Sequence, residues 1–507
     1  MKKKMISAIL LISVLLSAAC GADTSDSTTS DSKNSDTTSN DSNYVGEKST
    51  ETDRSESYSE SYLDIEENNR QYTDEDSLLT FSLKVDTASY SNTARYIESS
   101  NLPPADAVRT EELINYFSYE GDLPYTSGPF SLSAEVGQSP FDNSKHIAMV
   151  RVKTKEIDAD ELPSSNLTFL IDTSGSMDSY DKLPLLKEAF ALLVETLDED
   201  DRVSIVTYSG SSAVVLDSAS GADKQKILKA INRLEASGST AGADGIQTAY
   251  KLSKKNYMKN GNNRIILATD GDFNVGISDL DELEQFIAQK RDSGMYLSIL
   301  GFGTGNLKDD TMETLSTNGN GNYMYINSVE DAQKGLVNEM GSNLYTVADD
   351  VKAQIEFNSN NVKSYRLIGY ENRQTSDEEF DDDSKDAGEI GAGTDVVMMF
   401  ELELEEDSAD ELFKVRIRYK KSGESESELF EVPVDYSEIT DKPSSDFTFA
   451  CSVVGFGHLL RDSEYAGDIT IDQIIEMAEE NLGFDQDGYR YDYLELLEEY
   501  QNIAKYN

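Results

Sequence analysis

The chain is poor in the residues that build disulfide frameworks, zinc sites and thiol- or imidazole-based active sites. Its 507 residues include two cysteines, Cys20 and Cys451, and two histidines, His146 and His458. The histidines lie far apart in apolar surroundings, so we interpret them as core or surface side chains rather than catalytic groups. The sequence also contains no glycine-rich phosphate loop with its lysine and no cysteine–histidine pair, which removes the usual signals of nucleotide-binding and thiol-based enzymes.

Positive charge is scarce as well. Against 44 Lys and Arg stand 96 Asp and Glu, which gives a formal net charge of −52. Such a chain repels polyanions, so we expect no nucleic-acid partner and no charge-driven binding to an anionic lipid surface. Cationic partners and divalent ions remain compatible with this charge, and so does the simpler interpretation that it keeps an exported protein soluble.

Long apolar runs are also missing, because the run at residues 6–16 is shorter than the roughly 20 residues that a membrane-spanning helix needs. It follows a basic start, Met1-Lys-Lys-Lys-Met, and precedes Ser17-Ala-Ala-Cys20. We interpret residues 1–19 as a lipoprotein signal peptide. Its end resembles a bacterial lipobox, which implies that Cys20 is acylated, as with palmitate, and anchors the protein at the extracytoplasmic face of the cell membrane. Cys451 is then left without a disulfide partner and fits an inert core thiol.

Residues 20–78 are dominated by Ser, Thr, Asp, Asn and Glu and contain few aliphatic side chains. A segment of this composition cannot bury enough apolar surface to offset its chain entropy. We therefore predict a lipidated, disordered tether that lets the folded part move several nanometres from the membrane.

The remaining chain divides into three patterns. Residues 79–160 mix short strand-like and helix-like stretches, which predicts a mixed α+β segment able to pack with the carboxyl-terminal region. Residues 165–345 alternate apolar strands with amphipathic helices, which predicts a doubly wound, mostly parallel α/β sheet with helices on both faces. Residues 347–507 begin with strands that lack intervening helices, which predicts an antiparallel β-sandwich with helices at the carboxyl terminus.

Small oxygen-bearing side chains follow two of the strands expected in the α/β region. Asp172, Ser174 and Ser176 occupy alternate positions after residues 167–171. Asp270 follows the strand expected at 264–269, and Thr240 lies in a turn flanked by glycines. Because parallel strands present their carboxyl ends at one sheet edge, these loops can converge on one cation. Oxygen-only ligation favours Mg²⁺, Mn²⁺ or Ca²⁺ over zinc or copper.

The order and spacing of these five residues resemble the metal-ion-dependent adhesion site (MIDAS) of von Willebrand factor type A (vWA) domains, and the resemblance covers residues 165–345. It implies that Ser174 and Ser176 bind the metal directly. It also implies that Thr240 does so in a ligand-ready state. Asp172 and Asp270 would then act mainly through bound water molecules.

The sequences on both sides of this region resemble those of one subgroup of vWA proteins. Residues 109–117, 364–372 and 387–393 are similar to those of bacterial vWA lipoproteins with a carboxyl-terminal extension, a group sometimes described as calcium-activated channel homologues. This description implies no pore, since no stretch beyond the signal peptide is long and apolar enough to line one.

Three functions remain open. We predict a membrane-tethered, non-enzymatic binding module whose Mg²⁺-type ion captures an Asp or Glu side chain of a protein partner. The alternatives are a Mg²⁺-dependent phosphoryl-transfer hydrolase using Asp172 and a scaffold whose metal only stabilises the fold. The hydrolase is disfavoured because such enzymes need a second carboxylate two positions after the first, as general acid, and this chain has Ser174 there.

Overall fold

The computed structural model describes residues 60–505 except residues 85, 159–160, 239–244, 272–279, 384–386, 407–409, 423, 425 and 484. The described residues belong to one compact unit. The predicted signal peptide, Cys20 and most of the predicted tether lie outside them. No helix in the described part of the chain is long and apolar enough to cross a membrane.

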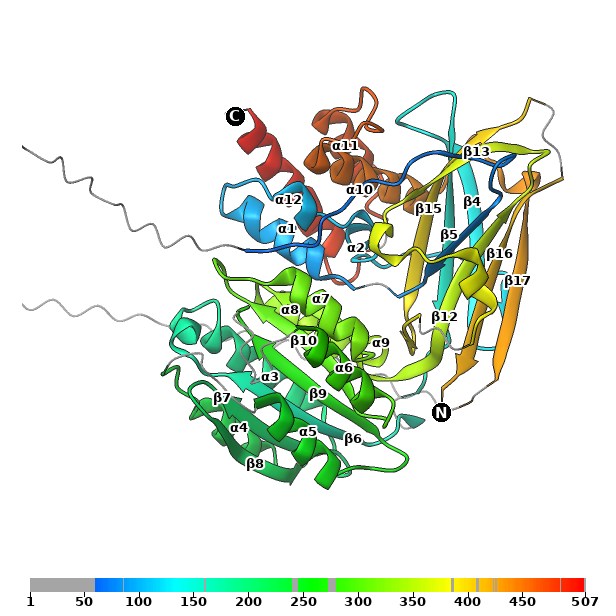
Figure 1. The fold of residues 1–507 in the computed structure, drawn as a ribbon. Coiled ribbons are helices and arrows are strands. Elements are labelled where there is room, and N and C mark those ends of the chain that lie inside the picture. The colour runs from blue at the N-terminus through cyan, green and yellow to red at the C-terminus, as the bar shows by residue number, and fades with distance from the viewer. Residues whose placement is uncertain are drawn as a thin grey trace, which may run out of the picture. The chain divides into compact units, whose positions relative to one another are not determined.

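A six-stranded sheet with the order β11-β10-β9-β6-β7-β8 forms the centre of the α/β region (Figure 1). Its strands are β6 (Ser165–Asp172), β7 (Arg202–Tyr208), β8 (Ser212–Ser220), β9 (Asn262–Thr269), β10 (Tyr296–Phe302) and β11 (Tyr323–Ile326). Neighbouring strands run parallel, except that the edge strand β8 is antiparallel to β7. The helices are α3 (Leu183–Thr196), α4 (Lys224–Asn232), α5 (Gly245–Lys255), α6 (Leu280–Arg291), α7 (Asp309–Asn318), α8 (Val329–Gln333), the π-helix Lys334–Asn338 and α9 (Met340–Leu344).

Strand β6 shows why helices cover both faces of this sheet. Every residue of β6 is buried. Phe169 and Ile171 pack in a core with residues of α3 and α4, whereas Leu170 packs in a second core with residues of α5, α6 and α7. A strand buried on both faces needs a nearly continuous apolar run, which Leu167, Phe169, Leu170 and Ile171 provide here. The predicted doubly wound, mostly parallel α/β sheet is confirmed.

An antiparallel β-sandwich is formed by strands from before and after the α/β region. One sheet has the order β1-β13-β15-β5-β4-β3, and the other has the order β14-β12-β16-β17 with β2 paired to β12. The strands are β1 (Gln71–Tyr72), β2 (Leu78–Ser82), β3 (Tyr125–Ser127), β4 (Phe130–Gln138), β5 (His146–Thr154), β12 (Thr346–Phe357), β13 (Val362–Ile368), β14 (Ile390–Gly391), β15 (Asp395–Leu404), β16 (Glu411–Lys421) and β17 (Ser427–Asp435). Side chains of both sheets, such as Val150 and Ile355, share one core. The segment before the α/β region therefore supplies strands to both sheets.

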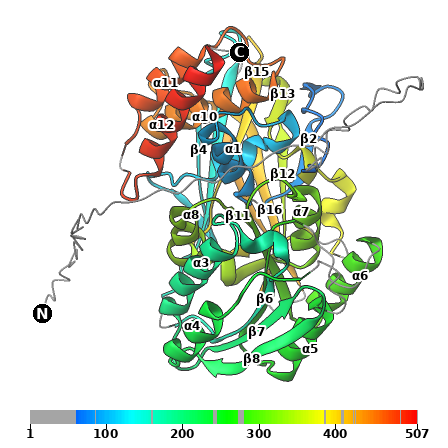
Figure 2. The ribbon, with the colours of Figure 1, turned by 90° about the vertical axis from the view of Figure 1, so that its left-hand side faces the viewer.

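Helices cover the outer face of the sheet that contains β5 and β15 (Figure 2). They are α1 (Ala88–Glu98), α2 (Thr110–Ile114), α10 (Ser445–Arg461), α11 (Ile471–Glu479) and α12 (Tyr489–Ala504). Along β5, Ile147 and Met149 pack with these helices, while Ala148 and Val150 face the sandwich core. The predicted sandwich with carboxyl-terminal helices is confirmed, and α1 and α2 add helices from the amino-terminal side.

The ordered chain begins earlier than we predicted. We expected a disordered tether up to residue 78, yet residues 60–78 are bound to the folded unit. Both oxygens of the Glu60 carboxylate accept hydrogen bonds from Arg95 at 2.8 Å, and one also accepts the N–H of Gly305 at 2.8 Å. Strand β1 pairs with β13, and Ile65 is buried. The prediction was wrong because it considered only the surface that this polar segment could bury by itself, whereas partners elsewhere in the fold order it.

A buried group of charges joins α7 of the α/β region to α2. Arg109 donates a hydrogen bond from Nε to Glu112 at 2.5 Å and from Nη1 to Asp309 at 2.6 Å. These three side chains are at most 3% exposed. Beside them, Arg373 donates to Asp86 at 3.2 Å and also pairs with Glu313. Buried charges of this kind depend on their partners, because each one left alone would keep the full cost of its desolvation.

Glu112 should make the stability of the fold depend on pH. Burial raises its pKa from 4.5 to about 8, even though the Arg109 charge acts in the opposite direction. A carboxyl group whose pKa is raised on folding stabilises the fold fully below its unfolded pKa, and that contribution is lost as the pH rises through the folded pKa. We therefore expect the free energy of unfolding of wild type to fall, relative to that of Glu112→Gln, as the pH rises from about 5 to about 8.

Urea unfolding at stepped pH measures this difference. The matched control is Glu498→Gln on the exposed side of α12, which should follow the wild-type profile. If the free energies of unfolding of wild type and Glu112→Gln run parallel across this range, Glu112 does not carry the predicted pH dependence.

Candidate metal site at the carboxyl edge of the parallel sheet

The paired strands β6 and β9 bring Asp172 and Asp270 together. The parallel register sets Ile171 of β6 opposite Ala268 of β9, so each aspartate leaves its strand at the same edge. Both side chains are fully buried. Thr269 donates a hydrogen bond to Asp172 Oδ2 at 3.4 Å. The convergence expected from parallel-strand topology is therefore present for these two residues.

The loop after β6 folds around Asp172. The backbone N–H of Ser174 donates to Asp172 Oδ1 at 2.7 Å, which is the two-residue bond of an Asx turn. This turn sets the Ser174 and Ser176 hydroxyl oxygens 2.9 Å apart. Ser174 is buried whereas Ser176 is exposed, so the group of oxygens extends from the buried carboxylate to solvent.

The loop that carries Thr240 begins beside the loop after β6. Ser237 N–H donates to the Thr173 carbonyl at 2.8 Å, and Gly175 N–H donates to the Gly238 carbonyl at 3.2 Å. Gly238 has φ of +90°, a conformation that favours glycine. Thr240 itself lies outside the described residues, so its contact with the other four predicted residues stays a prediction.

The electrostatics of this edge fit a hard cation. Burial raises the pKa of Asp172 to about 6, hydrogen bonds from Ser174 act in the opposite direction, and the charge of Asp270 raises it further. Asp270 Oδ1 is buried and has no hydrogen-bond partner among the described residues. A buried carboxylate oxygen without a partner is costly, and a bound cation would satisfy it.

The donor set also restricts the kind of metal. Within the described residues, no three His, Cys, Asp or Glu side chains come together in a group that could hold a metal. The residues predicted for this edge combine the carboxylate oxygens of Asp172 and Asp270 with the hydroxyl oxygens of Ser174 and Ser176. Such a set is typical of Mg²⁺, Mn²⁺ or Ca²⁺ and unlike the nitrogen and sulfur ligands of zinc.

Sequence reasoning missed Lys182, which reaches the same edge. Its Nζ donates to Asp270 Oδ2 at 2.9 Å and to Asn306 Oδ1 at 3.2 Å, and its side chain is 8% exposed. Lys182 is the N-cap of α3. A positive charge is unfavourable at a helix amino terminus, so a lysine at this position was a weak signal that it has a specific carboxylate partner.

Two other side chains singled out in the sequence, Cys451 and His458, are core groups. Cys451 is buried, and burial raises the pKa of its thiol, as expected for an inert cysteine. His458 is buried, and burial together with the nearby charges of Arg366 and Arg461 holds its pKa well below the usual range. His146 lies on β5 and is half-buried. Cys20 is outside the described residues, so its acylation stays a prediction.

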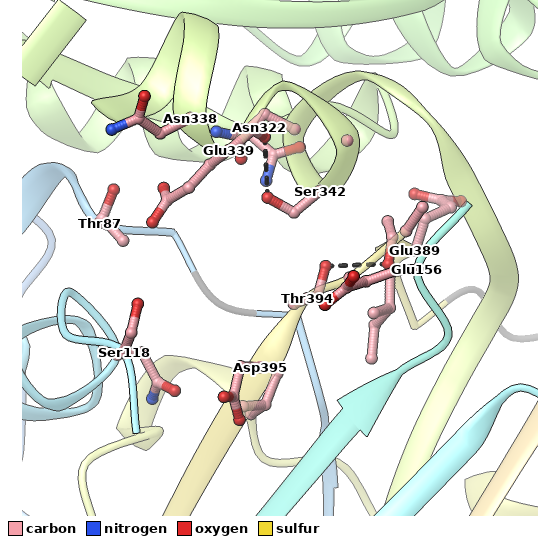
Figure 3. Close-up of a pocket in the computed structure, with 18 of the residues that line it drawn as sticks. Thr87, Ser118, Glu156, Asn322, Asn338, Glu339, Ser342, Glu389, Thr394 and Asp395 are labelled. Carbon is pink, nitrogen blue, oxygen red and sulfur yellow. Dashed lines mark hydrogen bonds between the residues drawn. The ribbon is translucent and has the colours of Figure 1, made fainter. Parts of the chain in front are cut away.

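A cavity of about 410 Å³ lies away from this edge. Figure 3 shows Asn338, Glu339 and Ser342 on one side of it, facing Ser118 and Asp395. None of the predicted metal-site residues lines the cavity. Its lining is polar, and two of its carboxylates already have cationic partners, since Asp395 pairs with Arg151 and Glu339 with Lys334.

Three family models match successive parts of the chain. The model for von Willebrand factor type A domains matches residues 166–339, and a model described as von Willebrand factor matches residues 56–149. The model for the carboxyl-terminal region of the uncharacterized protein YfbK matches residues 342–503.

Individual relatives share different lengths of the chain. The uncharacterized protein YfbK of Escherichia coli K12 is 41% identical over 463 residues, which are 86% of this chain and 80% of that protein. Human inter-alpha-trypsin inhibitor heavy chain H3 is 27% identical over 192 residues, which are 36% of this chain and 21% of that protein. Among solved structures, a von Willebrand factor type A protein from Catenulispora acidiphila aligns with a TM-score of 0.42 and 16% identity, covering 75% of this chain and 91% of that one.

Proposed function

Because this chain belongs to the family of von Willebrand factor type A domain proteins that includes YfbK of Escherichia coli, we propose that it binds a protein partner through a divalent cation. Domains of this type commonly mediate protein–protein interaction. The observation that carries the proposal is the buried pair Asp172 and Asp270. One oxygen of Asp270 has no hydrogen-bond partner among the described residues, and the hydroxyls of Ser174 and Ser176 extend from the buried carboxylates toward solvent.

The chain's own residues would share the work of holding the cation. Ser174, Ser176 and Thr240 would contribute neutral hydroxyl oxygens, and Asp172 and Asp270 would contribute negative charge, directly or through water. A Mg²⁺, Mn²⁺ or Ca²⁺ ion bound there supplies an uncompensated positive charge that attracts a carboxylate. The exposed Ser176 marks the side from which an Asp or Glu side chain of the partner can approach.

We place this binding module at the extracytoplasmic face of the cell membrane, anchored through a lipid on Cys20. The support is the sequence of the first 20 residues and the polar segment that follows them. The described chain begins with Glu60, which is bound to Gly305 in the loop after β10 of the vWA domain. Glu60 also accepts hydrogen bonds from Arg95 of α1, so it contacts both the vWA domain and the amino-terminal segment.

A non-enzymatic role is preferred over phosphoryl transfer. The hydrolase alternative needs a general acid two positions after Asp172, and there Ser174 presents a hydroxyl that contacts Ser176. The scaffold alternative, in which metal only stabilises the fold, makes a different prediction, because partner capture would then survive removal of the metal-binding residues.

Cross-linking capture from native membranes tests the proposal. We expect Ser174→Ala and Thr240→Ala to reduce capture of the partner by at least about tenfold, the scale on which lost support for a metal ligand lowers affinity. Chelation with EDTA should have the same effect on wild type, and added Mg²⁺ or Mn²⁺ should restore capture. Direct Mn²⁺ titration should show the matching loss of metal binding in both variants.

The matched control is Ser131→Ala, which removes an exposed hydroxyl from β4 of the sandwich and should capture as wild type does. Capture that survives both EDTA and Ser174→Ala would contradict metal-bridged recognition. Hydrolysis of an aryl phosphate that is lost in Asp172→Asn would favour the enzyme instead.

A further inference from the structure

Lys182 occupies a position built for it between three loops at the metal edge. It is the N-cap of α3, its Nζ contacts Asp270 after β9, and it also contacts Asn306 after β10. Its stem lies directly against Gly303, where an added Cβ would overlap the Lys182 side chain. Gly303 has φ of +70°, so the backbone there also favours glycine.

The loop after β10 is held tightly against the loop after β9. A Cβ added at Gly271, whose φ is +121°, would overlap the backbone of Asn306. Gly305 N–H in the same loop donates to the Glu60 carboxylate at 2.8 Å, which fixes the loop from its other side. The Lys182 side chain is therefore packed against the loop after β10, which is itself packed against the start of the loop after β9.

The two carboxylate oxygens of Asp270 have different surroundings. Oδ2 accepts from Lys182, whereas Oδ1 is buried without a hydrogen-bond partner among the described residues. The carboxylate thus has one oxygen neutralised by a cation from the chain itself and one available to a cation from solution.

We propose that Lys182 is an internal counter-ion of the metal site, which pairs with Asp270 in the metal-free protein and competes with the metal for that carboxylate. This inference rests on the proposed function, because it concerns how the same site is loaded. In this proposal Lys182 contacts Asp270 and neither the metal nor the partner, so it is a positioning residue.

Two physical effects of removing Lys182 act in the same direction. The metal-free protein loses the partner of a fully buried carboxylate, which makes that state less stable. The metal-bound protein loses a positive charge that repels the incoming ion. Both effects raise the metal affinity of the site, and both make the stability of the fold more dependent on metal.

Mn²⁺ titration followed by calorimetry tests this inference. We expect Lys182→Met to bind Mn²⁺ about tenfold more tightly than wild type, which corresponds to 1.4 kcal/mol. Lys182→Gln, which keeps hydrogen-bond donors without the charge, should shift affinity in the same direction and serves if the methionine variant does not fold. Lys187→Met on the same helix is the matched control, because its Nζ donates to the Leu234 carbonyl, and it should bind as wild type does.

Thermal unfolding in EDTA gives a second readout that involves no metal. Lys182→Met should melt several degrees below wild type, and combining it with Asp270→Asn should cost much less than the sum of the two single changes. Mn²⁺ should raise the melting temperature of Lys182→Met more than that of wild type.

The outcomes separate the inference from the proposed function. If wild type binds Mn²⁺ and both Lys182 variants bind equally or more weakly, or if the double variant shows no coupling, the counter-ion role is overturned while the metal site stands. If neither wild type nor any Lys182 variant binds Mn²⁺, the proposed metal site is itself overturned.

Discussion

Replacing Arg109 by methionine is expected to lower the free energy of unfolding by about 3–5 kcal/mol, the cost of removing one partner from a buried ion pair. Arg109 contacts Asp309 at 2.6 Å and Glu112 at 2.5 Å, and all three side chains are almost fully buried. Methionine fills much of the same volume, so the loss would come from the unpaired carboxylates rather than from a cavity. Urea unfolding measured by circular dichroism gives the value.

Arg418→Met is the matched control for this experiment. Arg418 also pairs with two carboxylates, those of Asp381 and Asp383, but these are 79% and 45% exposed. Solvent screens such pairs, so we expect a change below about 1 kcal/mol. Equal losses in the two variants would show that burial does not set the strength of the Arg109 pairs. The result matters for function, because Arg109 joins the helices of the β-sandwich to α7 of the vWA domain.

Phe81→Ala should be comparably damaging, with an expected loss of about 3–5 kcal/mol for a large-to-small change in a core. Phe81 is fully buried on β2, and its ring centroid lies 5.1 Å from that of Tyr370. Strand β2 belongs to the amino-terminal segment but pairs with β12, which follows the vWA domain. Denaturant unfolding of the full chain measures whether this segment is an integral part of the sandwich.

Leu429→Ala on β17 provides the comparison, because Leu429 belongs to the same sheet and is 48% exposed. Surface changes of this kind usually alter stability by less than about 0.5 kcal/mol. A loss below about 1 kcal/mol for Phe81→Ala would mean that β2 docks weakly on a sandwich that is stable without it.

Strand topology accounts for two of the five residues predicted for the metal site, Asp172 and Asp270. Apolar runs ending in Asp172 and before Asp270 identified the strand ends, and parallel order then required both aspartates to meet at one edge. The hydroxyls of Ser174 and Ser176 follow within the same turn. Strands and the turns that follow them depend mainly on neighbouring residues, so they can be predicted from the sequence. The position of Thr240 stays a prediction.

Lys182 and Glu60 could not be assigned in the same way. Lys182 meets Asp270 across 88 positions of the chain, and Glu60 meets Gly305 across 245. Neither residue lies in a sequence pattern that identifies its partner. A sequence does not distinguish a polar side chain that binds a distant group from one that is exposed to solvent. Their partners depend on which loops the packed helices bring into contact.

The sequence by itself determined where most strands and helices of the α/β region and the sandwich lie, because the spacing of apolar residues shows which face of each element is buried. It also determined the chemical nature of the candidate site, because oxygen-bearing side chains at strand ends require only local order. The tertiary structure alone decided where the polar segment after residue 59 binds and which cation faces Asp270. Those contacts follow from long-range packing, whose geometry is set by the whole fold rather than by neighbouring residues.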